Sequence, residues 1–238
     1  MKRIAVIEEL QKHKNPDRAV LLSRYFKTGK GEYAQGDIFL GLTVPLQRQI
    51  AKTYRSLALS DIETLLTSAI HEYRLTALII LTLQFSASAP VRQKELYDFY
   101  LAHTDYINNW DLVDLSAPRI IGGFLLERKP KRRVLYRLAK SEVLWERRIA
   151  VMATFPFLRA GDFADTFAIS TILIHDSHDL IHKAVGWMLR EAGKVNQSAE
   201  EVFLEKYSST MPRTMLRYAI EKFSDDKRAY YLSRRSAL

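Results

Sequence analysis

The 238-residue chain is long enough for one domain with a sizeable core. It has no cysteine, which excludes a disulfide framework, a zinc finger and thiolate chemistry, and indicates a reducing compartment such as the cytoplasm. Its formal net charge of +9 attracts polyanions, of which nucleic acid is the commonest, although a basic protein without such a partner is the alternative.

The start of the sequence and its apolar stretches argue against export and against a membrane span. Only four apolar residues separate Arg3 from Glu8, which is too short for the core of a signal peptide. The longest apolar stretch, residues 75–83, is interrupted by threonine and falls well below the roughly 20 residues that a membrane span requires. Glycine and proline are scarce, and residues that lose little on entering a helix dominate. We therefore expect a soluble, helical protein with no membrane association.

Residues 28–43 form the one long break between amphipathic segments and hold four of the nine glycines. The sequence TGKGEYAQGDIFLGLT predicts a loop, and loops carry functional residues more often than the elements they connect. It is not a phosphate-binding P-loop, because no Gly-Lys-Ser/Thr follows at the required spacing and no strand precedes it.

Amphipathic segments recur with short breaks, most clearly at residues 71–85 and 144–158. A small residue recurs near the middle of every second predicted helix, at separations of 40, 33, 36 and 33 residues: Ala77, Ala117, Ala150, Gly186 and Ala219. This period is typical of helix-pair solenoids, whose repeats run from about 33 to 47 residues. We predict an all-α fold, a HEAT-like helical-repeat superhelix with one concave face, forming a single domain over residues 1–238. A compact helical bundle is the alternative.

The segment INNWDLVDLSAP is the most unusual in the chain. Asn109 or Asp111 can cap a helix that begins there, which places Trp110 and Asp114 about one turn apart on the same side. Pro118 cannot donate a hydrogen bond to the carbonyl of Asp114, so a kink is expected beside this carboxylate. The alternative is a purely structural segment with a core tryptophan and a surface carboxylate.

Two further segments place cations where an anionic ligand can meet them. In WERR, Arg147 and Arg148 can clamp phosphate oxygens, because guanidinium groups match these oxygens bidentately. In HKAVGWMLREAGK, spacings of four and three put Lys183, Trp187 and Arg190 on one helical face, which suits an anionic, planar ligand. Solvated arginines and a tryptophan packed on the neighbouring repeat are the alternatives.

The repeat register relates several of these residues to one another. Asp114 lies three residues before its small residue, Arg148 and Arg217 lie two before theirs, and Trp187 lies one after. If the second helix of every pair lines the concave face, these side chains converge there.

A histidine-rich run has residue types that can bind a metal ion: His175, Asp176, His178, Asp179 and His182. These ligands would straddle a loop and a helix start, and Asp179 fits better as a helix cap, so we expect no metal ion and no other cofactor. Neither a Ser-His-Asp pattern nor a nucleophile elbow is present in the sequence.

The sequence resembles the DNA alkylation repair family of alkylpurine DNA glycosylases, the AlkD-like proteins with HEAT-like repeats. The resemblance extends from about Tyr25 to Phe223 and is carried, in order, by SRYFKTGKGEYAQGDIFLGLTVPLQR, HEYRLTALIIL, INNWDLVDLSAP, LWERRIAVMATF, DLIHKAVGWMLREAGK and MPRTMLRYAIEKF. One departure is the loop from Gly29 to Gly36, which is longer than in the best-known member and puts the range of substrates in doubt.

The resemblance implies a role for several residues. The family's catalytic aspartate falls on Asp114, its two sugar-contacting tryptophans on Trp110 and Trp187, and its active-site arginine on Arg148. Tyr25 and Arg190 match family positions close to the DNA. Together with the residues found from spacing, the expected DNA-binding set is Tyr25, Arg147, Arg148, Lys183, Arg190 and Arg217.

The expected activity is hydrolysis of the N-glycosidic bond of purines alkylated at N3 or N7 in double-stranded DNA, as in base excision repair. Such a base is cationic and leaves without protonation, so the enzyme has to stabilise the positive charge that grows on the deoxyribose. Asp114 can do so electrostatically or by orienting water, and indole faces favour the same cation. With no amine nucleophile, the expected enzyme is a monofunctional, monomeric hydrolase with no obligatory protein partner.

Two other functions remain open. A non-catalytic solenoid that binds branched or distorted DNA would share the basic surface, and only a base-release assay separates it from the glycosylase. A protein-interaction scaffold is the commonest use of helical repeats and predicts weak DNA binding.

Overall fold

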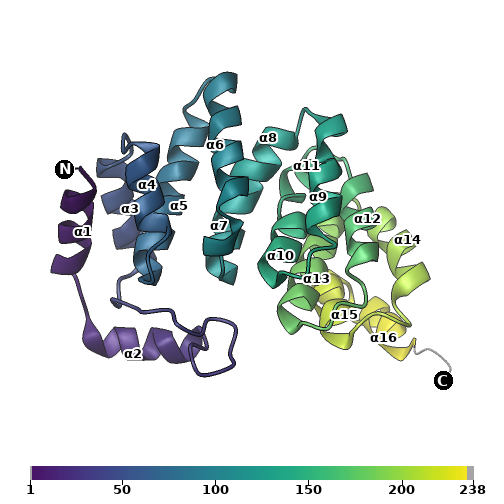
Figure 1. Cartoon of the computed structure of the whole chain (residues 1–238). Helices are drawn as coiled ribbons and strands as arrows, with labels where there is room; N and C mark the ends of the chain where they lie inside the picture. The colour runs from purple at the N-terminus through teal and green to yellow at the C-terminus, as the bar shows by residue number, and fades with distance from the viewer. Residues whose placement is uncertain (1, 235–238) are drawn as a thin grey trace. The chain divides into compact units, whose positions relative to one another are not determined.

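The computed structural model describes residues 2–234, which are helical throughout most of their length (Figure 1). The chain divides into two compact units, Met1–Ile120 and Ile121–Leu238. Among the residues described, the nearest approach to a strand is an isolated bridge between Ile38 and Ile70. The predicted all-α class is therefore confirmed, whereas the single domain and the concave face stay predictions.

The first unit consists of helices joined by short turns, apart from the long loop after the second helix. In chain order the elements are α1 (Lys2–Lys12), α2 (Pro16–Tyr25), α3 (Val44–Thr53), α4 (Leu59–Leu66), α5 (His71–Ser86), α6 (Pro90–Ala102), a 3₁₀ turn (Thr104–Tyr106) and α7 (Trp110–Ala117). Helix α5 packs against α3, α4, α6 and α7, so it forms the centre of this unit. Thirteen of its sixteen residues are buried, which explains why it is apolar around nearly its whole circumference.

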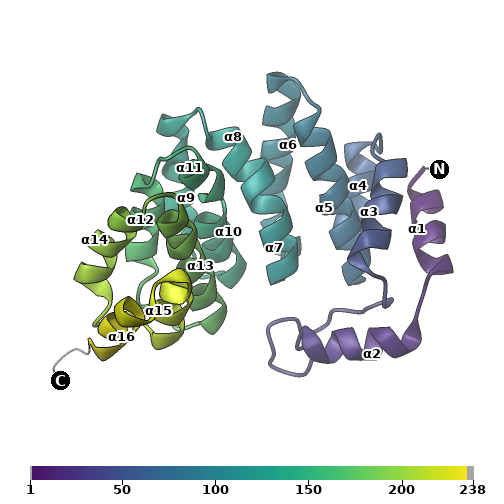
Figure 2. The ribbon, with the colours of Figure 1, turned by 180° about the vertical axis from the view of Figure 1, so that it is seen from behind.

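Helix α2 is arranged differently from its neighbours. Figures 1 and 2 show it running roughly crosswise to α3 and α5 rather than alongside them. None of its residues is fully buried, and it leads directly into the long loop. The loop predicted at residues 28–43 is thus confirmed between α2 and α3.

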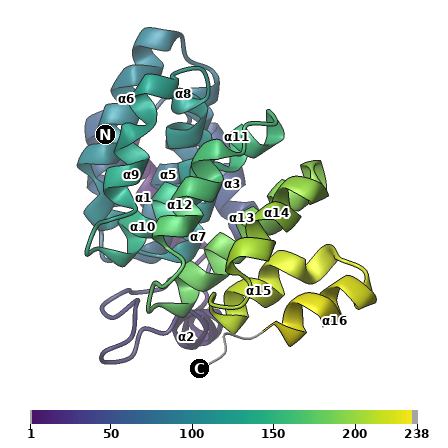
Figure 3. The same ribbon diagram turned by 90° about the vertical axis from the view of Figure 1, so that its right-hand side faces the viewer.

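The second unit is also built from short helices around one long one. In chain order the elements are α8 (Gly123–Leu125), a 3₁₀ turn (Lys129–Arg132), α9 (Arg133–Leu138), α10 (Leu144–Met152), α11 (Phe155–Arg159), α12 (Ala164–Ile172), α13 (Asp179–Val195), α14 (Gln197–Tyr207), α15 (Arg213–Ala219), a 3₁₀ turn (Ile220–Lys222) and α16 (Asp225–Ser233). Helix α13 packs against α10, α14 and α15, as Figure 3 shows.

The small residues that marked the repeat are contact points between helices. All five are buried, and each lies in one of the helices α5, α7, α10, α13 and α15. At Gly186 a Cβ would lie 2.4 Å from the carbonyl oxygen of Met215 and 2.5 Å from Cβ of Tyr218. Glycine at this position therefore lets the backbones of α13 and α15 approach each other closely.

The ends of α7 follow from its sequence. Asn109 is the N-cap, and its side-chain oxygen accepts a hydrogen bond of 2.8 Å from the backbone N–H of Trp110. The helix ends at Ala117, and a π-helical turn, Pro118–Gly122, follows it. The α-helical hydrogen bonding ends at Pro118, because this residue has no N–H with which to continue it, and the kink expected beside Asp114 stays a prediction.

The start of α13 corrects an expectation from the sequence. The N-cap is His178 and not Asp179: the ring nitrogen Nδ1 of His178 accepts a hydrogen bond of 3.1 Å from the backbone N–H of Leu180. Burial lowers the pKa of His178, in keeping with an unprotonated nitrogen that accepts. Within residues 2–234, no helix has the length and apolar character needed to cross a membrane.

Candidate functional site

The candidate catalytic segment of the first unit is α7, which carries Trp110 in its first turn and Asp114 one turn later. Both side chains are partly buried. The indole of Trp110 stacks on Phe26 at a centroid distance of 5.2 Å and an angle of 22°, and the ring of Tyr25 meets it edge-on at 5.9 Å. The aromatic residues that end α2 therefore hold one of the two predicted indoles in place.

The stack continues below Phe26 into the unit. Phe26 lies parallel to Phe39 from the long loop, at 5.1 Å, and Phe39 stacks on the imidazole of His71 at 4.6 Å. His71 is the first residue of α5 and is only 2% exposed. Residues from α2, the loop, α5 and α7 thus form one aromatic cluster beneath Trp110.

His71 joins two carboxylates. Its Nε2 lies 2.8 Å from Asp111 on α7, and its Nδ1 lies 3.1 Å from Asp37 in the loop. Burial by itself would lower the pKa of His71, but the negative charge of Asp111 and hydrogen bonds with both carboxylates raise this pKa to about 9. The imidazole is consequently a cation at neutral pH, and it ties the first turn of α7 to the loop.

Arg74 completes this network from the next turn of α5. It pairs with Asp37 at 2.7 Å and donates a hydrogen bond of 2.8 Å to the carbonyl of Ser68. Burial acts to raise the pKa of Asp37, but hydrogen bonds and charge from His71 and Arg74 lower it overall. Two buried cations therefore face two carboxylates, and the charges balance locally.

Glu72, between His71 and Arg74, fixes the end of the loop. Its carboxylate accepts hydrogen bonds of 2.8 to 3.1 Å from three successive backbone N–H groups, those of Leu40, Gly41 and Leu42. Gly41 has a φ of 88°, and a Cβ there would lie 2.1 Å from the carbonyl oxygen of Asn15. The glycine-rich loop is therefore anchored at this end by a buried carboxylate and by a turn that only glycine fits.

The sequence reasoning did not identify His71, Glu72, Arg74 and Asp37 as functional positions. The available sign is that His, Glu and Arg, within HEYR, open a helix whose next residues, 75–83, are apolar except for two threonines. Such residues are seldom fully buried unless they are paired, so their partners had to be close. The partners come from the loop and from α7, and spacing in the sequence does not disclose them.

The C-terminal half of α7 is held by α6. The hydroxyl of Tyr100 lies 2.9 Å from that of Ser116, and both residues are fully buried. Burial raises the pKa of Tyr100, and the nearby charge of Asp114 adds to this rise. α7 is therefore fixed at its start by His71 and near its end by Tyr100, with Asp114 between.

The second unit carries the other predicted indole. Trp187 on α13 is partly buried, and its Nε1 donates a hydrogen bond of 3.1 Å to Glu191. Lys183 pairs with Asp179 at 2.7 Å one turn before it, and Arg190 pairs with Glu221. The predicted cation–indole–cation stripe does lie along one helix, but its two cations are bound to acidic groups of the same unit.

The two arginines of WERR have different surroundings. Arg147 pairs with Asp176 at 2.6 Å and donates to the carbonyls of Ser141 and Glu142, so it fastens the segments before α10 and α13. Arg148 is only 4% exposed and donates to the carbonyl of Leu180 in the first turn of α13. Arg147 therefore has an acidic partner within its own unit, and the phosphate clamp expected of it stays a prediction.

Two predicted DNA-binding residues are exposed. Tyr25 is 65% exposed at the end of α2, although one edge of its ring contacts Trp110. Arg217 on α15 is exposed, and within residues 2–234 it has no ion-pair partner.

The histidine-rich run is used for local structure. The carboxylate of Asp176 pairs with Arg147, and the backbone carbonyl of Asp176 accepts a hydrogen bond from the ring of His182. His178 caps α13. In the part of the chain that the structure describes, no group of three or more His, Asp or Glu side chains is arranged to hold a metal ion.

Comparisons with known proteins agree with this architecture. A solved structure described as a predicted DNA alkylation repair enzyme from Enterococcus faecalis superposes with a TM-score of 0.70 over 89% of this chain and 97% of its own, at 18% identity. The crystal structure of AlkD2 from Streptococcus mutans superposes with a TM-score of 0.55 over 88% of this chain and 98% of its own, at 17% identity. These likenesses establish the fold. No curated protein sequence matches the chain.

The family follows from the sequence as a whole. The model of the DNA alkylation repair enzyme family matches residues 6–223, nearly the full length of the chain. The match includes both units and every residue of the candidate site, and it supports a role in the repair of alkylated DNA. The chain therefore belongs to the DNA alkylation repair enzyme family.

Proposed function

We propose that the protein is a monofunctional DNA glycosylase that binds double-stranded DNA and releases purines alkylated at N3 or N7. Asp114 is the catalytic carboxylate in this proposal, and Trp110 contacts the deoxyribose. The observation that carries it is the fixed geometry of α7: an indole held by an aromatic stack and a carboxylate one turn away on the same helix.

The network around His71 distinguishes between the two carboxylates of α7. Asp111 is bound by the imidazolium of His71 at 2.8 Å, and its other oxygen accepts the backbone N–H of Leu112 at 2.9 Å. Its charge is therefore neutralised, and its task is to orient the helix. Asp114 lies one turn after Trp110 on α7, next to the indole that the aromatic stack holds in place. This supports Asp114 as the group that acts on a substrate.

The reaction needs stabilisation of a cation and no general acid. A purine alkylated at N3 or N7 is positively charged and departs as a neutral base, while positive charge grows on the sugar. A preorganised carboxylate stabilises this charge or orients the attacking water. The face of a fixed indole adds about 0.5 to 2 kcal/mol, because its quadrupole attracts cations. No metal or cofactor takes part in the proposed chemistry.

Trp187 and Arg148 keep, as part of the proposal, the roles that the family resemblance implies for them. Trp187 would contact sugar through its indole face, since its N–H is already bound to Glu191. The buried guanidinium of Arg148 would support the active site, while Tyr25 and the exposed Arg217 would meet the DNA backbone. Lys183 and Arg190 would do so after exchanging their acidic partners for phosphate.

The proposal is tested by comparing two lesions in otherwise identical duplexes. We expect release of 7-methylguanine, which is cationic, and no release of hypoxanthine, which is neutral and requires protonation to leave. The product strand should contain an abasic site and remain uncut until it is treated with alkali. Equal release of both bases would contradict the proposed chemistry. Tight binding of the duplex without release of either base would favour a non-catalytic DNA-binding protein instead.

A further inference from the structure

A strip of exposed cations in the first unit has no role in the site described above. Arg48 and Lys52 lie one turn apart on one side of α3, and Arg55 follows two residues after this helix ends. Arg119, in the π-helical turn that follows α7, lines the same hollow as Arg48 and Lys52. We call these four residues the basic strip.

The basic strip borders a hollow between three helices. A space of about 210 Å³ is lined by Arg48 and Lys52 from α3, by Leu115 and Arg119 from α7 and the turn after it, and by apolar or hydroxyl side chains of α5: Ile79, Thr82 and Leu83. Leu115 directly follows Asp114 in the sequence. The hollow is therefore lined in part by α7, the helix that also carries Asp114, although Asp114 itself does not line it.

The cations of the basic strip are not neutralised by the protein. Among residues 2–234, Arg48, Lys52 and Arg55 have no ion-pair partner. The lining of the hollow contains no Asp or Glu in the described part of the chain. Partial burial, with a smaller contribution from the charge of Arg48, lowers the pKa of Arg119. These exposed cations are therefore available to an anion from outside the protein.

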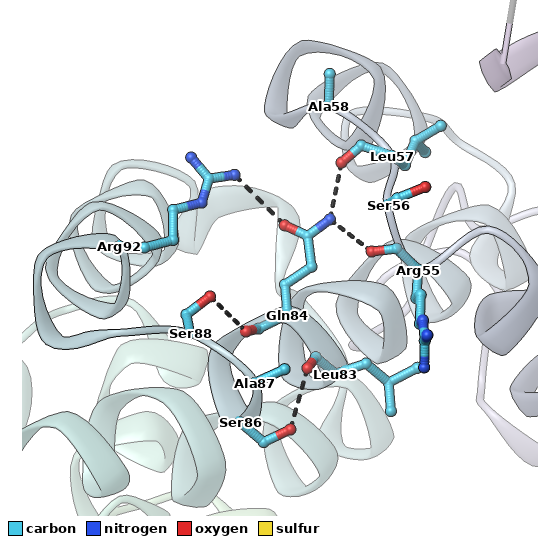
Figure 4. Close-up of a pocket in the computed structure, with 10 residues that line it drawn as sticks. All are labelled: Arg55, Ser56, Leu57, Ala58, Leu83, Gln84, Ser86, Ala87, Ser88 and Arg92. Atoms are coloured by element: carbon cyan, nitrogen blue, oxygen red, sulfur yellow. Dashed lines mark hydrogen bonds between the residues drawn. The ribbon is translucent and has the colours of Figure 1, made fainter.

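A neighbouring hollow extends this surface toward Arg55. It has a volume of about 730 Å³ and is lined by Arg55, Leu83, Gln84, Arg92 and several small residues (Figure 4). The side-chain amide of Gln84 donates hydrogen bonds of 2.9 and 2.8 Å to the carbonyls of Arg55 and Leu57. Figure 4 shows the guanidinium of Arg55 pointing away from this amide, on the side of Leu83, which lines both hollows. Gln84 therefore covers carbonyl oxygens that would repel an anion.

We infer that the basic strip is a binding site for backbone phosphates of DNA, separate from the residues proposed for catalysis. The inference rests on the proposed function in so far as DNA is the partner. Guanidinium and ammonium groups are the usual ligands of phosphodiester oxygens, and they position a duplex without reading its sequence. The strip supplies four of them and no acidic group.

A polymeric anion fits the strip better than a small one. Arg48 and Lys52 are about 6 Å apart along the axis of α3, and Trp110 and Arg119 are about 13 Å apart along α7 and the turn that follows it. A duplex carries one negative charge per roughly 1.7 Å of its axis, so one duplex presents phosphates over both distances. A single phosphate ion would reach only part of the strip.

The test is the salt dependence of binding to an undamaged duplex, measured by fluorescence anisotropy between 50 and 200 mM salt. Each phosphate contact contributes about 0.9 to the slope of log affinity against log salt. The double variant R48A/K52A should reduce the magnitude of this slope by about 1.8. Between 50 and 200 mM salt, the factor by which its affinity falls should therefore be ~12-fold smaller than the factor for the wild type. The single variant R55A should reduce the slope by about half as much.

A matched control removes two exposed cations elsewhere. Arg137 and Lys140, at and just after the end of α9, are exposed and, within residues 2–234, unpaired. The variant R137A/K140A has the same net charge as R48A/K52A and should keep the slope of the wild type. All four cations of these two variants lie at the surface, so thermal unfolding should confirm that both variants fold.

The outcomes separate this inference from the proposed function. Wild-type slopes in R48A/K52A and R55A would overturn the basic strip even if the protein releases 7-methylguanine. Reduced slopes would support the strip even if no base is released. Binding of inorganic phosphate to the wild type that R48A/K52A abolishes, together with an unchanged DNA slope, would show a small-anion site and overturn the inference. A wild type that does not bind DNA would overturn both.

Discussion

The buried cation at His71 gives the protein a predictable dependence of stability on pH. The structure raises the pKa of His71 from an ordinary value of 6.5 to about 9. A group whose pKa is raised on folding stabilises the folded state fully below its unfolded pKa, and this contribution is lost as the pH rises through the folded pKa. The window in this protein therefore runs from pH 6.5 to about 9.

The magnitude follows from the same shift. The difference between these two pKa values of His71 corresponds to about 3 kcal/mol, at about 1.4 kcal/mol for one pKa unit. Substituting glutamine for His71 removes the titration and weakens the link between α7 and the loop. The free energy of unfolding of His71→Gln should lie well below that of the wild type at pH 6. This gap should shrink by up to about 3 kcal/mol between pH 6.5 and pH 9.5.

Urea unfolding followed by circular dichroism at a series of pH values measures this gap. His13→Gln is the control, because His13 lies exposed at the end of α1, outside the aromatic cluster. Its unfolding profile should run parallel to that of the wild type. If the profiles of the wild type and His71→Gln were also parallel from pH 6 to 9.5, His71 would not be the buried cation that joins Asp37 and Asp111, and the reasoning would fail.

Two further predictions concern the loop and the contact between α13 and α15. Glu72→Gln retains the size of the side chain but loses the charge that accepts three backbone N–H groups. The free energy of unfolding should therefore fall by about 2 to 3 kcal/mol. Trypsin should also cut sooner after Lys30, as mass spectrometry of the fragments would show. Glu63→Gln, at an exposed position of α4, should leave the cleavage rate unchanged. Gly186→Ala places a Cβ 2.4 Å from the carbonyl of Met215 and should destabilise the protein by about 1 to 3 kcal/mol, seen as a lower Tm. Gly29→Ala is the control, because its added Cβ meets only the flexible end of Glu32, and it should change the Tm little. An equal fall in Tm in Gly186→Ala and Gly29→Ala would contradict the close packing of α13 on α15.

Much of the fold could be predicted because it depends on local patterns. The period of buried small residues located α5, α7, α10, α13 and α15, and the glycine-rich stretch located the long loop. Asn109 as a cap and Pro118 as a break set the limits of α7, since both act through their own backbone neighbours. At α13 the same reasoning chose Asp179 over His178, because a histidine ring rarely serves as a cap.

The candidate site could be predicted only in part. The positions of Trp110 and Asp114 on one helix follow from their spacing, and the partners of His71 do not, because Asp37 and Asp111 lie 34 and 40 residues away. The same limit applies to Arg147. Its position in WERR suggested a phosphate clamp, but the acidic partner, Asp176, lies 29 residues further along the chain. Pairing of charges across a fold is decided by tertiary structure, which local spacing does not report.

The most direct test of the central claim is the single-turnover release of 7-methylguanine from duplex DNA by Asp114→Asn. We predict that release falls by at least about 100-fold, since a preorganised charge at the transition state contributes several kcal/mol, while affinity for undamaged duplex stays within about twofold of the wild type. Asp98→Asn, which neutralises an exposed aspartate on α6, should release the base at the wild-type rate. Release by Asp114→Asn at the wild-type rate would contradict the assignment of Asp114 as the catalytic carboxylate.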